Sequence, residues 1–286
     1  MSINRLREQL KNLRMPGAGV KLDLRLSEAR CNSLEHGDFL ELLLQDELLH
    51  RAGNKIRSAL KAAGFRNLKP LADFDWQFNP NLERKLFYEL AGGEFIRQAQ
   101  NILMVGPSGT GKTCLAQAIG FEAIKLGFTV IYRSIFDIVS HLQRFNALSD
   151  RNPEFERYLK ADLLIIDDMG LKQLPEKAGE LLFEIIFRRH ELKSTIMTSN
   201  RPLDDWGKLI GDVPTAGAIL DRFLQQARLI PFKGKSFRPP IRTPRAGAAD
   251  GKRRPPRRGG RSPTGSCRGW LTLKWLSLNH ATHGAN

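Results

Sequence analysis

The stretch GPSGTGKT, residues 106–113, is the most informative part of this 286-residue chain. It follows the pattern G-x-x-x-x-G-K-[ST], with fixed positions at Gly106, Gly111, Lys112 and Thr113. A short apolar run, NILMV at 101–105, precedes it and a helix-forming segment follows it, which is the setting of a phosphate-binding loop. A glycine-rich turn between strand and helix can be purely structural, but the complete motif in this setting predicts nucleotide binding.

Each part of this loop has an expected role toward ATP. Its glycines let the backbone wrap around phosphates with N–H groups pointing inward, and the following helix adds its partial positive charge. Lys112 is expected to reach the β- and γ-phosphates, and the Thr113 hydroxyl to bind Mg²⁺. We therefore predict ATP and Mg²⁺ as cofactors. The residues expected to bind the nucleotide are Gly106, Pro107, Ser108, Gly109, Thr110, Gly111, Lys112 and Thr113.

A second stretch, LLIIDDMG at residues 163–170, ends a predicted buried strand in two adjacent aspartates. Ligands of a parallel sheet collect at the carboxyl ends of its strands, so this strand end is expected beside the phosphate loop. Asp167 is the candidate Walker B residue, which would hold Mg²⁺ directly or through water. Because strand side chains alternate between faces, Asp168 should leave in another direction and could polarise the attacking water. The alternative is that Asp168 merely begins a turn.

Two further polar positions are expected near the same sheet. Asn200 follows the strand-like run STIMTS and could hold the attacking water or sense the γ-phosphate, although TSNRP could also be an ordinary turn. Arg222 lies in the helical segment before the last strand, where it could stabilise charge on the ATP of a neighbouring subunit. The alternative for Arg222 is a solvated ion pair with Asp221, which would contribute little.

Apolar strands alternate with helices through the middle of the chain. The expected strands are 101–105, 128–132, 162–167, 194–200 and 228–232. The expected helices between them are 114–127, 134–145, 175–193 and 217–227. Ser134 is a candidate N-cap of the second helix. This alternation predicts an α/β fold with a parallel five-stranded sheet that helices cover on both faces.

The chain divides into four predicted parts. We expect a helical N-terminal domain at 1–70 for DNA or partner interaction, a linker at 71–100 packed on the ATPase core, an ATPase domain at 101–238 and a tail at 239–286. Gly64 is expected to end the last helix of the first part. Basic residues cluster near it: Arg51, Lys55, Arg57, Lys61, Arg66 and Lys69. A solvated helix face is the favoured interpretation of these charges.

Composition excludes several classes of protein. The hydrophobic fraction of 41% is enough for a packed core, whereas the apolar runs are far shorter than a membrane-spanning helix needs. The first residues hold no continuous apolar block and so do not resemble a secretory signal. Cys31, Cys114 and Cys267 are far apart and show no metal-ligand spacing. We expect a cytoplasmic protein with no membrane partner and no structural zinc site.

The formal net charge of +15 is concentrated near the end of the chain. From residue 241 onward, ten lysines and arginines stand against Asp250 alone. A basic segment suggests nucleic acid as a partner, whereas a segment rich in Pro, Arg and Gly can also be disordered and solvated. The tail could be a DNA-binding extension or the product of a frameshift or readthrough. We favour the second origin, because residues 239–286 show neither periodicity nor enough apolar residues for a core.

Several of these segments together resemble the IstB-like ATPases, the ATP-binding helper proteins of insertion sequences. The segments are GPSGTGKT, LLIIDDMG, STIMTSNRPLDDWGKLIGD and AILDRF, with DFLELLLQDELLHR and LADFDW before them. The likeness extends over about residues 5–238. Such proteins are AAA+ proteins related to DnaC-type helicase loaders and DnaA initiators. The resemblance therefore implies a AAA+ P-loop NTPase fold with a small all-helical N-terminal domain.

The resemblance also implies roles and partners. By position, Walker A contains Lys112 and Thr113, Walker B contains Asp167 and Asp168, sensor 1 is Asn200 and the arginine finger is Arg222. A homo-oligomer would assemble on double-stranded DNA in an ATP-dependent way and stimulate a partner transposase. A DnaC-type helicase loader and an inactive nucleotide-binding remnant of a mobile element are the alternatives. The residues that fall where this clade inserts a DNA-contacting helix are Arg144, Arg151 and Arg157.

Overall fold

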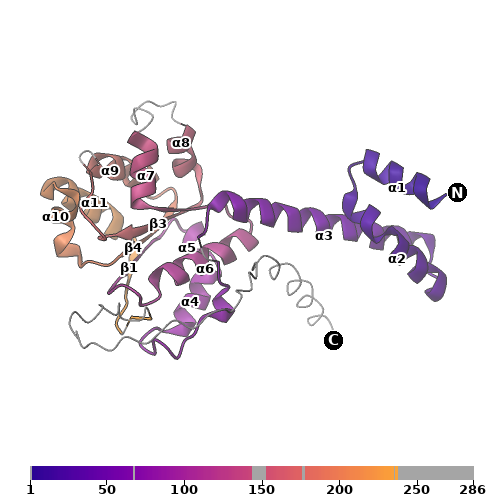
Figure 1. The fold of residues 1–286 in the computed structure, drawn as a ribbon, viewed down its shortest axis with the longest axis horizontal. Helices are drawn as coiled ribbons and strands as arrows, with labels where there is room; N and C mark the ends of the chain where they lie inside the picture. Colours follow the sequence, from indigo (N-terminus) through magenta and orange to yellow (C-terminus); the bar gives the residue numbers. More distant parts are fainter. Residues whose placement is uncertain (1, 67, 144–152, 176–177, 235, 238–286) are drawn as a thin grey trace, which may run out of the picture. The chain divides into compact units, whose positions relative to one another are not determined.

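The computed structural model of the protein describes residues 2–66, 68–143, 153–175, 178–234 and 236–237 (Figure 1). Within these residues the centre is a five-stranded sheet in the order β2-β3-β4-β1-β5, and every neighbouring pair of strands is parallel. The strands are β1 (Asn101–Val105), β2 (Val130–Ser134), β3 (Leu163–Met169), β4 (Ser194–Ser199) and β5 (Ala227–Pro231). The predicted parallel α/β class is confirmed.

Two layers of helices cover this sheet. One layer consists of α7 (Ile135–Gln143), α8 (Pro153–Lys160), α9 (Ala178–Arg189), α10 (Trp206–Ile210) and α11 (Val213–Leu224). The other layer consists of α4 (Arg84–Ala91), α5 (Glu94–Arg97) and α6 (Lys112–Lys125). Side chains of β3 alternate between them, with Leu164 and Ile166 in the first layer and Leu163 and Ile165 in the second. Burial of both faces explains why β3 begins with a continuous apolar run at residues 163–166.

The beginning of the chain is helical. It contains α1 (Ile3–Asn12), α2 (Pro16–Asn32) and α3 (His36–Ala63), which we call the N-terminal helices. Their shared apolar cluster consists of Ala18, Leu22 and Leu43. Figure 1 shows α3 as one continuous helix, and its last residue, Ala63, is fully buried in the apolar cluster that also contains α6. Gly64 follows in the left-handed conformation and ends α3, as predicted.

The observed strands begin and end within two residues of the expected ones. The strand expected at 128–132 is shifted to Val130–Ser134. The reason is that the N–H groups of Gly127 and Phe128 still bond to carbonyl groups of α6, so that these residues belong to the turn that ends this helix. Two short 3-10 helices complete the described elements, at Leu71–Asp73 and Leu203–Asp205.

Capping side chains set the start of two helices. The hydroxyl of Ser134 accepts a hydrogen bond from the Asp137 N–H at 3.1 Å, which confirms its predicted capping of α7. The helix expected to begin at residue 217 begins at Val213 instead. Asp212 caps it there, because its carboxylate accepts from the Thr215 N–H at 3.2 Å.

Some predictions concern residues that the structure does not describe. The tail at 239–286, Arg144 and Arg151 lie outside the described residues. Arg157 lies on α8, where it forms an ion pair with Glu154 at 2.7 Å. In the ranges given above, no helix combines the length and the apolar character that crossing a membrane requires.

Candidate nucleotide-binding and hydrolysis site

The loop at residues 106–111 connects β1 to α6 in a conformation that depends on its glycines. Gly106, Gly109 and Gly111 have φ values of 154°, 81° and 100°. A Cβ atom at Gly106 would lie 2.1 Å from the carbonyl oxygen of Phe232, which is too close for any side chain. The glycines therefore let the chain curl at the N-terminus of α6, where the helix dipole favours an anion.

Lys112, the first residue of α6, is 4% exposed and extends its side chain into this loop. Its ammonium group donates hydrogen bonds to the carbonyl oxygens of Gly106 at 2.6 Å and Pro107 at 2.7 Å. The buried hydroxyl of Thr110 donates to the Pro107 carbonyl at 2.9 Å and helps to close the loop. The loop thus surrounds a positive charge at the place where the phosphates of a nucleotide are expected.

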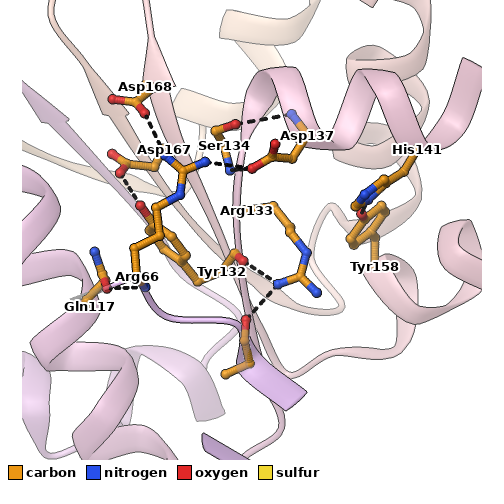
Figure 2. Close-up of polar contacts among 11 residues, drawn as sticks. Arg66, Gln117, Tyr132, Arg133, Ser134, Asp137, His141, Tyr158, Asp167 and Asp168 are labelled. Carbon is orange, nitrogen blue, oxygen red and sulfur yellow. Dashed lines mark hydrogen bonds and ion pairs between the residues drawn. The ribbon is translucent and has the colours of Figure 1, made fainter. Parts of the chain in front are cut away.

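Asp167, near the end of β3, is buried and accepts three hydrogen bonds. Thr113 of α6 donates to its Oδ1 atom at 3.0 Å, and Thr198 of β4 donates to the same oxygen. Tyr132 of β2 donates to Oδ2 at 2.5 Å (Figure 2). Burial and the Asp167 charge raise the pKa of Tyr132, which keeps the phenol a donor. The structure therefore brings the predicted Walker A hydroxyl into direct contact with the predicted Walker B carboxylate.

Sequence reasoning missed Tyr132 and Thr198 as partners of Asp167. Both lie on strands adjacent to β3, because the sheet order places β2 on one side of it and β4 on the other. The available signal was a hydroxyl group near the carboxyl end of each of two apolar strands, in FTVIY and in STIMTS. A polar atom buried in a sheet requires a hydrogen-bond partner, and Asp167 supplies it here.

β3 carries a bulge at its two adjacent aspartates. Between two paired positions β3 has one residue more than β4, so that Asp167 and Asp168 together face the single residue Thr198. Asp168 has a φ of 65°, a left-handed conformation that Asp tolerates better than most residues. Its N–H donates to the Thr198 hydroxyl at 3.3 Å. The two aspartates therefore lie in a bulge within a strand that continues to Met169, and not at a regular strand end as expected.

A cavity of about 510 Å³ opens between the loop and the strand ends, a size typical of small-molecule sites. Its lining includes seven of the predicted site residues: Ser108, Gly109, Gly111, Lys112, Thr113, Asp168 and Asn200. Asn200 is fixed at the end of β4, where its N–H donates to the Met169 carbonyl at 3.0 Å. Aromatic side chains also line the cavity: Phe74, Phe78 and Phe237. The cavity therefore combines polar groups near the loop with apolar walls.

Arg222 is not among the residues that line this cavity. It is exposed on α11, and its guanidinium carbon lies 5.2 Å from the centroid of the Phe187 ring. Within the described residues, the structure does not bring Arg222 together with Lys112, Asp168 and Asn200 around one cavity. An exposed position is nevertheless what a residue needs if it acts on the ATP of a neighbouring subunit.

The residues of this site fit Mg²⁺ and the phosphates of ATP. Mg²⁺ prefers oxygen ligands and is usually held by one or two carboxylates together with substrate phosphates. Thr113 and Asp167 supply a hydroxyl and a carboxylate 3.0 Å apart beside the cavity. In the part of the chain that the structure describes, no group of three or more His, Cys, Asp or Glu could hold a metal ion. Bound Mg²⁺ would take further ligands from the phosphates, as is usual for this ion.

Comparisons with known proteins agree with this site. The model of the family described as IstB-like ATP binding protein matches residues 8–243. A protein of Pseudomonas aeruginosa, named as an ATP-binding protein of insertion sequence IS21, is 33% identical over 229 residues, which are 80% of this chain and 86% of that one. A protein of Geobacillus stearothermophilus, named in the same way for IS5376, is 31% identical over 234 residues, which are 82% of this chain and 93% of that one.

Two solved structures are also similar to this chain. The DnaC helicase loader has a TM-score of 0.47 and 20% sequence identity, covering 62% of this chain and 99% of that one. DnaA from Aquifex aeolicus, bound to AMPPCP, has a TM-score of 0.49 and 25% identity, covering 59% of this chain and 51% of that one.

Proposed function

This chain belongs to the IstB-like ATP-binding proteins, and from that premise we propose that it is a AAA+ ATPase that acts in transposition. ATP binding drives its assembly on double-stranded DNA, and the assembled protein stimulates a partner transposase in the cytoplasm. The observation that supports ATP hydrolysis most directly is the contact of Thr113 with Asp167 beside a nucleotide-sized cavity. The names of the relatives, which assign those proteins to insertion sequences, support the transposition setting.

In the proposed reaction, the residues around the cavity act on different parts of the nucleotide. Backbone N–H groups of the loop bind phosphate oxygens. The ammonium group of Lys112 leaves the two loop carbonyls that it contacts and binds the β- and γ-phosphates instead. Thr113 and Asp167 would hold Mg²⁺, which would supply positive charge beside the phosphates. Asp168 accepts a hydrogen bond from the attacking water, and Asn200 orients the same water.

The proposed active state is a homo-oligomer. Arg222 is exposed on α11 and outside the lining of its own cavity, so its guanidinium is available to a neighbouring subunit. A neighbour's ATP would receive the positive charge of Arg222 in the transition state, which is the role of an arginine finger. Hydrolysis would then weaken the contact between subunits and reset the assembly.

Steady-state ATP hydrolysis, with and without duplex DNA, tests this function. The wild-type protein should hydrolyse ATP faster when duplex DNA is present, and Lys112→Ala should abolish ATP-dependent DNA binding because the loop loses its buried charge. Lys125→Ala is a matched control, since Lys125 ends the same helix and pairs with Glu122 on its surface. Unchanged DNA binding in Lys112→Ala would contradict coupling between the nucleotide and DNA. Stimulation by single-stranded DNA alone would favour a helicase loader.

A second variant separates the roles of the two aspartates. Asp168→Asn should retain ATP, slow hydrolysis and stabilise the assembled state, because the amide keeps the shape of the carboxylate but accepts hydrogen bonds less strongly. Nucleotide affinity and the size of the assembly on DNA measure these effects. Loss of ATP binding in a folded Asp168→Asn protein would show that the proposed division of roles is wrong. Absence of ATP hydrolysis in the wild type would favour an inactive nucleotide-binding remnant.

A further inference from the structure

Arg66, which follows the C-terminus of α3, extends to the end of β3 (Figure 2). Its guanidinium donates a hydrogen bond to Asp137 of α7 at 2.8 Å and lies 3.8 Å from the carboxylate of Asp168. Its backbone N–H donates to the side chain of Gln117 on α6 at 3.1 Å. One residue thus connects the end of the N-terminal helices with the helix of the phosphate loop and with the proposed water-positioning carboxylate.

The segment 63–66 that leads to this contact is held against β2. Arg133 donates to the last carbonyl group of α3 at 2.9 Å and so fixes the end of the helix (Figure 2). The ring of Phe65 lies 6.0 Å from the ring of Tyr132, whose hydroxyl group bonds to Asp167. A shift of the end of α3 would therefore reach Asp168 directly and Asp167 through Tyr132.

The two acidic partners hold Arg66 unequally. Partial burial would raise the pKa of Asp137, but hydrogen bonds from Ser134 and Arg66 outweigh it and hold this pKa below its ordinary value. The contact with Asp168 is longer than a hydrogen bond, and the side chains of Arg66 and Asp168 are 56% and 26% exposed. Exposed ion pairs of this kind contribute little to stability. The pair with Asp168 is thus weak enough to open during a reaction cycle, while Asp137 keeps the guanidinium nearby.

We propose that Arg66 is a positioning residue that restrains Asp168 until the N-terminal helices move. While Arg66 is paired with it, the guanidinium competes with water for the carboxylate, and hydrolysis is slow. Movement of α3 withdraws Arg66 and leaves the carboxylate able to accept a hydrogen bond from the attacking water. Duplex DNA that binds the N-terminal helices thereby accelerates hydrolysis at a distance. This inference rests on the proposed function and adds a regulatory contact to it.

ATPase rates of the full chain test this restraint. Arg66→Ala should raise kcat without DNA by about two- to fivefold, the range expected when one exposed ion pair is lost, and should change the KM for ATP by less than about twofold. The stimulation by duplex DNA should fall by the same factor, because the restraint has already been released. Arg66→Lys keeps the charge and should retain the wild-type rate. Arg97→Ala is the matched control, since Arg97 is 52% exposed and pairs with Glu94 on α5.

Three results would overturn the inference, and one would instead contradict the proposed function. A kcat of Arg66→Ala equal to or below that of the wild type would exclude a restraint, and an Arg66→Lys protein that behaves like Arg66→Ala would exclude the role of the charge. A wild-type protein without ATPase activity would contradict the proposed function but not the restraint by Arg66. Hydrogen exchange would then test the restraint by itself. Peptides covering 163–172 should exchange at least about twofold faster in Arg66→Ala than in Arg97→Ala, and equal exchange would overturn the inference.

Discussion

The N-terminal helices and the α/β core, by which we mean the sheet with its two helix layers, are stabilised by different forces. Large clusters of buried apolar side chains fill both faces of the sheet. The N-terminal helices share a much smaller cluster, and α3 exposes several leucines, including Leu44, Leu48 and Leu49. Charged contacts are prominent there, since Arg25 binds both carboxylate oxygens of Asp46, at 2.7 and 2.9 Å.

Glu47 is the central charged contact of the N-terminal helices. It is 3% exposed on α3 and accepts hydrogen bonds from the N–H groups of Gly17 and Ala18, at 2.7 and 3.1 Å. Arg51 donates to its other oxygen at 2.7 Å. The carboxylate therefore satisfies the N-terminus of α2 and ties it to α3. A region held by few charged contacts can loosen by itself, whereas an apolar core unfolds as a unit.

The difference in stability between the two regions should be greatest when a buried apolar side chain is truncated. Leu103→Ala removes a fully buried side chain of β1 and should lower the free energy of unfolding by about 2–5 kcal/mol. Leu43→Ala should lower it less, because Leu43 is 7% exposed in a small cluster whose surroundings can close around the gap. Urea unfolding followed by circular dichroism measures both. A larger loss for Leu43→Ala would show that the N-terminal helices depend on apolar packing as much as the core does.

Removing the Glu47 carboxylate should have a smaller and more local effect. Glu47→Ala leaves two backbone N–H groups of α2 without their acceptor and should destabilise the N-terminal helices by about 1–3 kcal/mol. Hydrogen exchange of α2 should accelerate, while exchange of the sheet stays unchanged. Glu41→Ala, at an exposed position of the same helix, is the matched control. Equal acceleration in the sheet would show that the two regions unfold together.

Acid should produce the smallest effect. Hydrogen bonds to Arg25 hold the pKa of Asp46 below its ordinary value of 3.8. Burial would raise the pKa of Glu47, but its hydrogen-bond donors outweigh it and hold this pKa below 4.5. Carboxylates with a depressed folded-state pKa stabilise the fold above their unfolded values, and this stabilisation is lost as the pH falls through the folded values. The N-terminal helices should therefore loosen below about pH 4.

Hydrogen exchange between pH 6 and pH 3, corrected for the intrinsic effect of pH, measures this loss. Protection of α2 and α3 should decrease before protection of the sheet, because apolar burial does not depend on these carboxylates. Loss of protection in the sheet at a higher pH than in α2 would contradict the expected order.

Much of the fold could be predicted because its signals are local. Five apolar runs and one phosphate-loop motif place the strands, and the alternation of strands with helices predicts a parallel sheet. The roles of Tyr132 and Arg66 could not be predicted in this way. The segment FTVIY is typical of any buried strand, and Arg66 belongs to a cluster of basic residues that resembles a solvated face. Their roles arise from contacts between segments that are far apart in the sequence.

The candidate site shows the same limit. The loop residues and Asp167 were identifiable from their motifs, whereas the position of Asp168 depends on how β3 pairs with β4. One additional residue in a strand leaves no local signal, since the sequence of a bulge differs little from that of a regular strand. Arg222 was singled out from its place before the last strand and from the resemblance, and its role toward a neighbouring subunit stays a prediction.

The bulge at Asp168 also has a consequence for mutations that inactivate such a protein without unfolding it. Its left-handed backbone conformation is one that Asn and Gly adopt at least as easily as Asp. A single nucleotide change in an Asp codon produces either residue, and each removes the carboxylate while the strand keeps its shape. Selection for abundance or solubility would not detect these changes. Inactive copies of a mobile element could therefore persist as folded proteins. A high yield of soluble protein on expression would not show whether a given copy hydrolyses ATP.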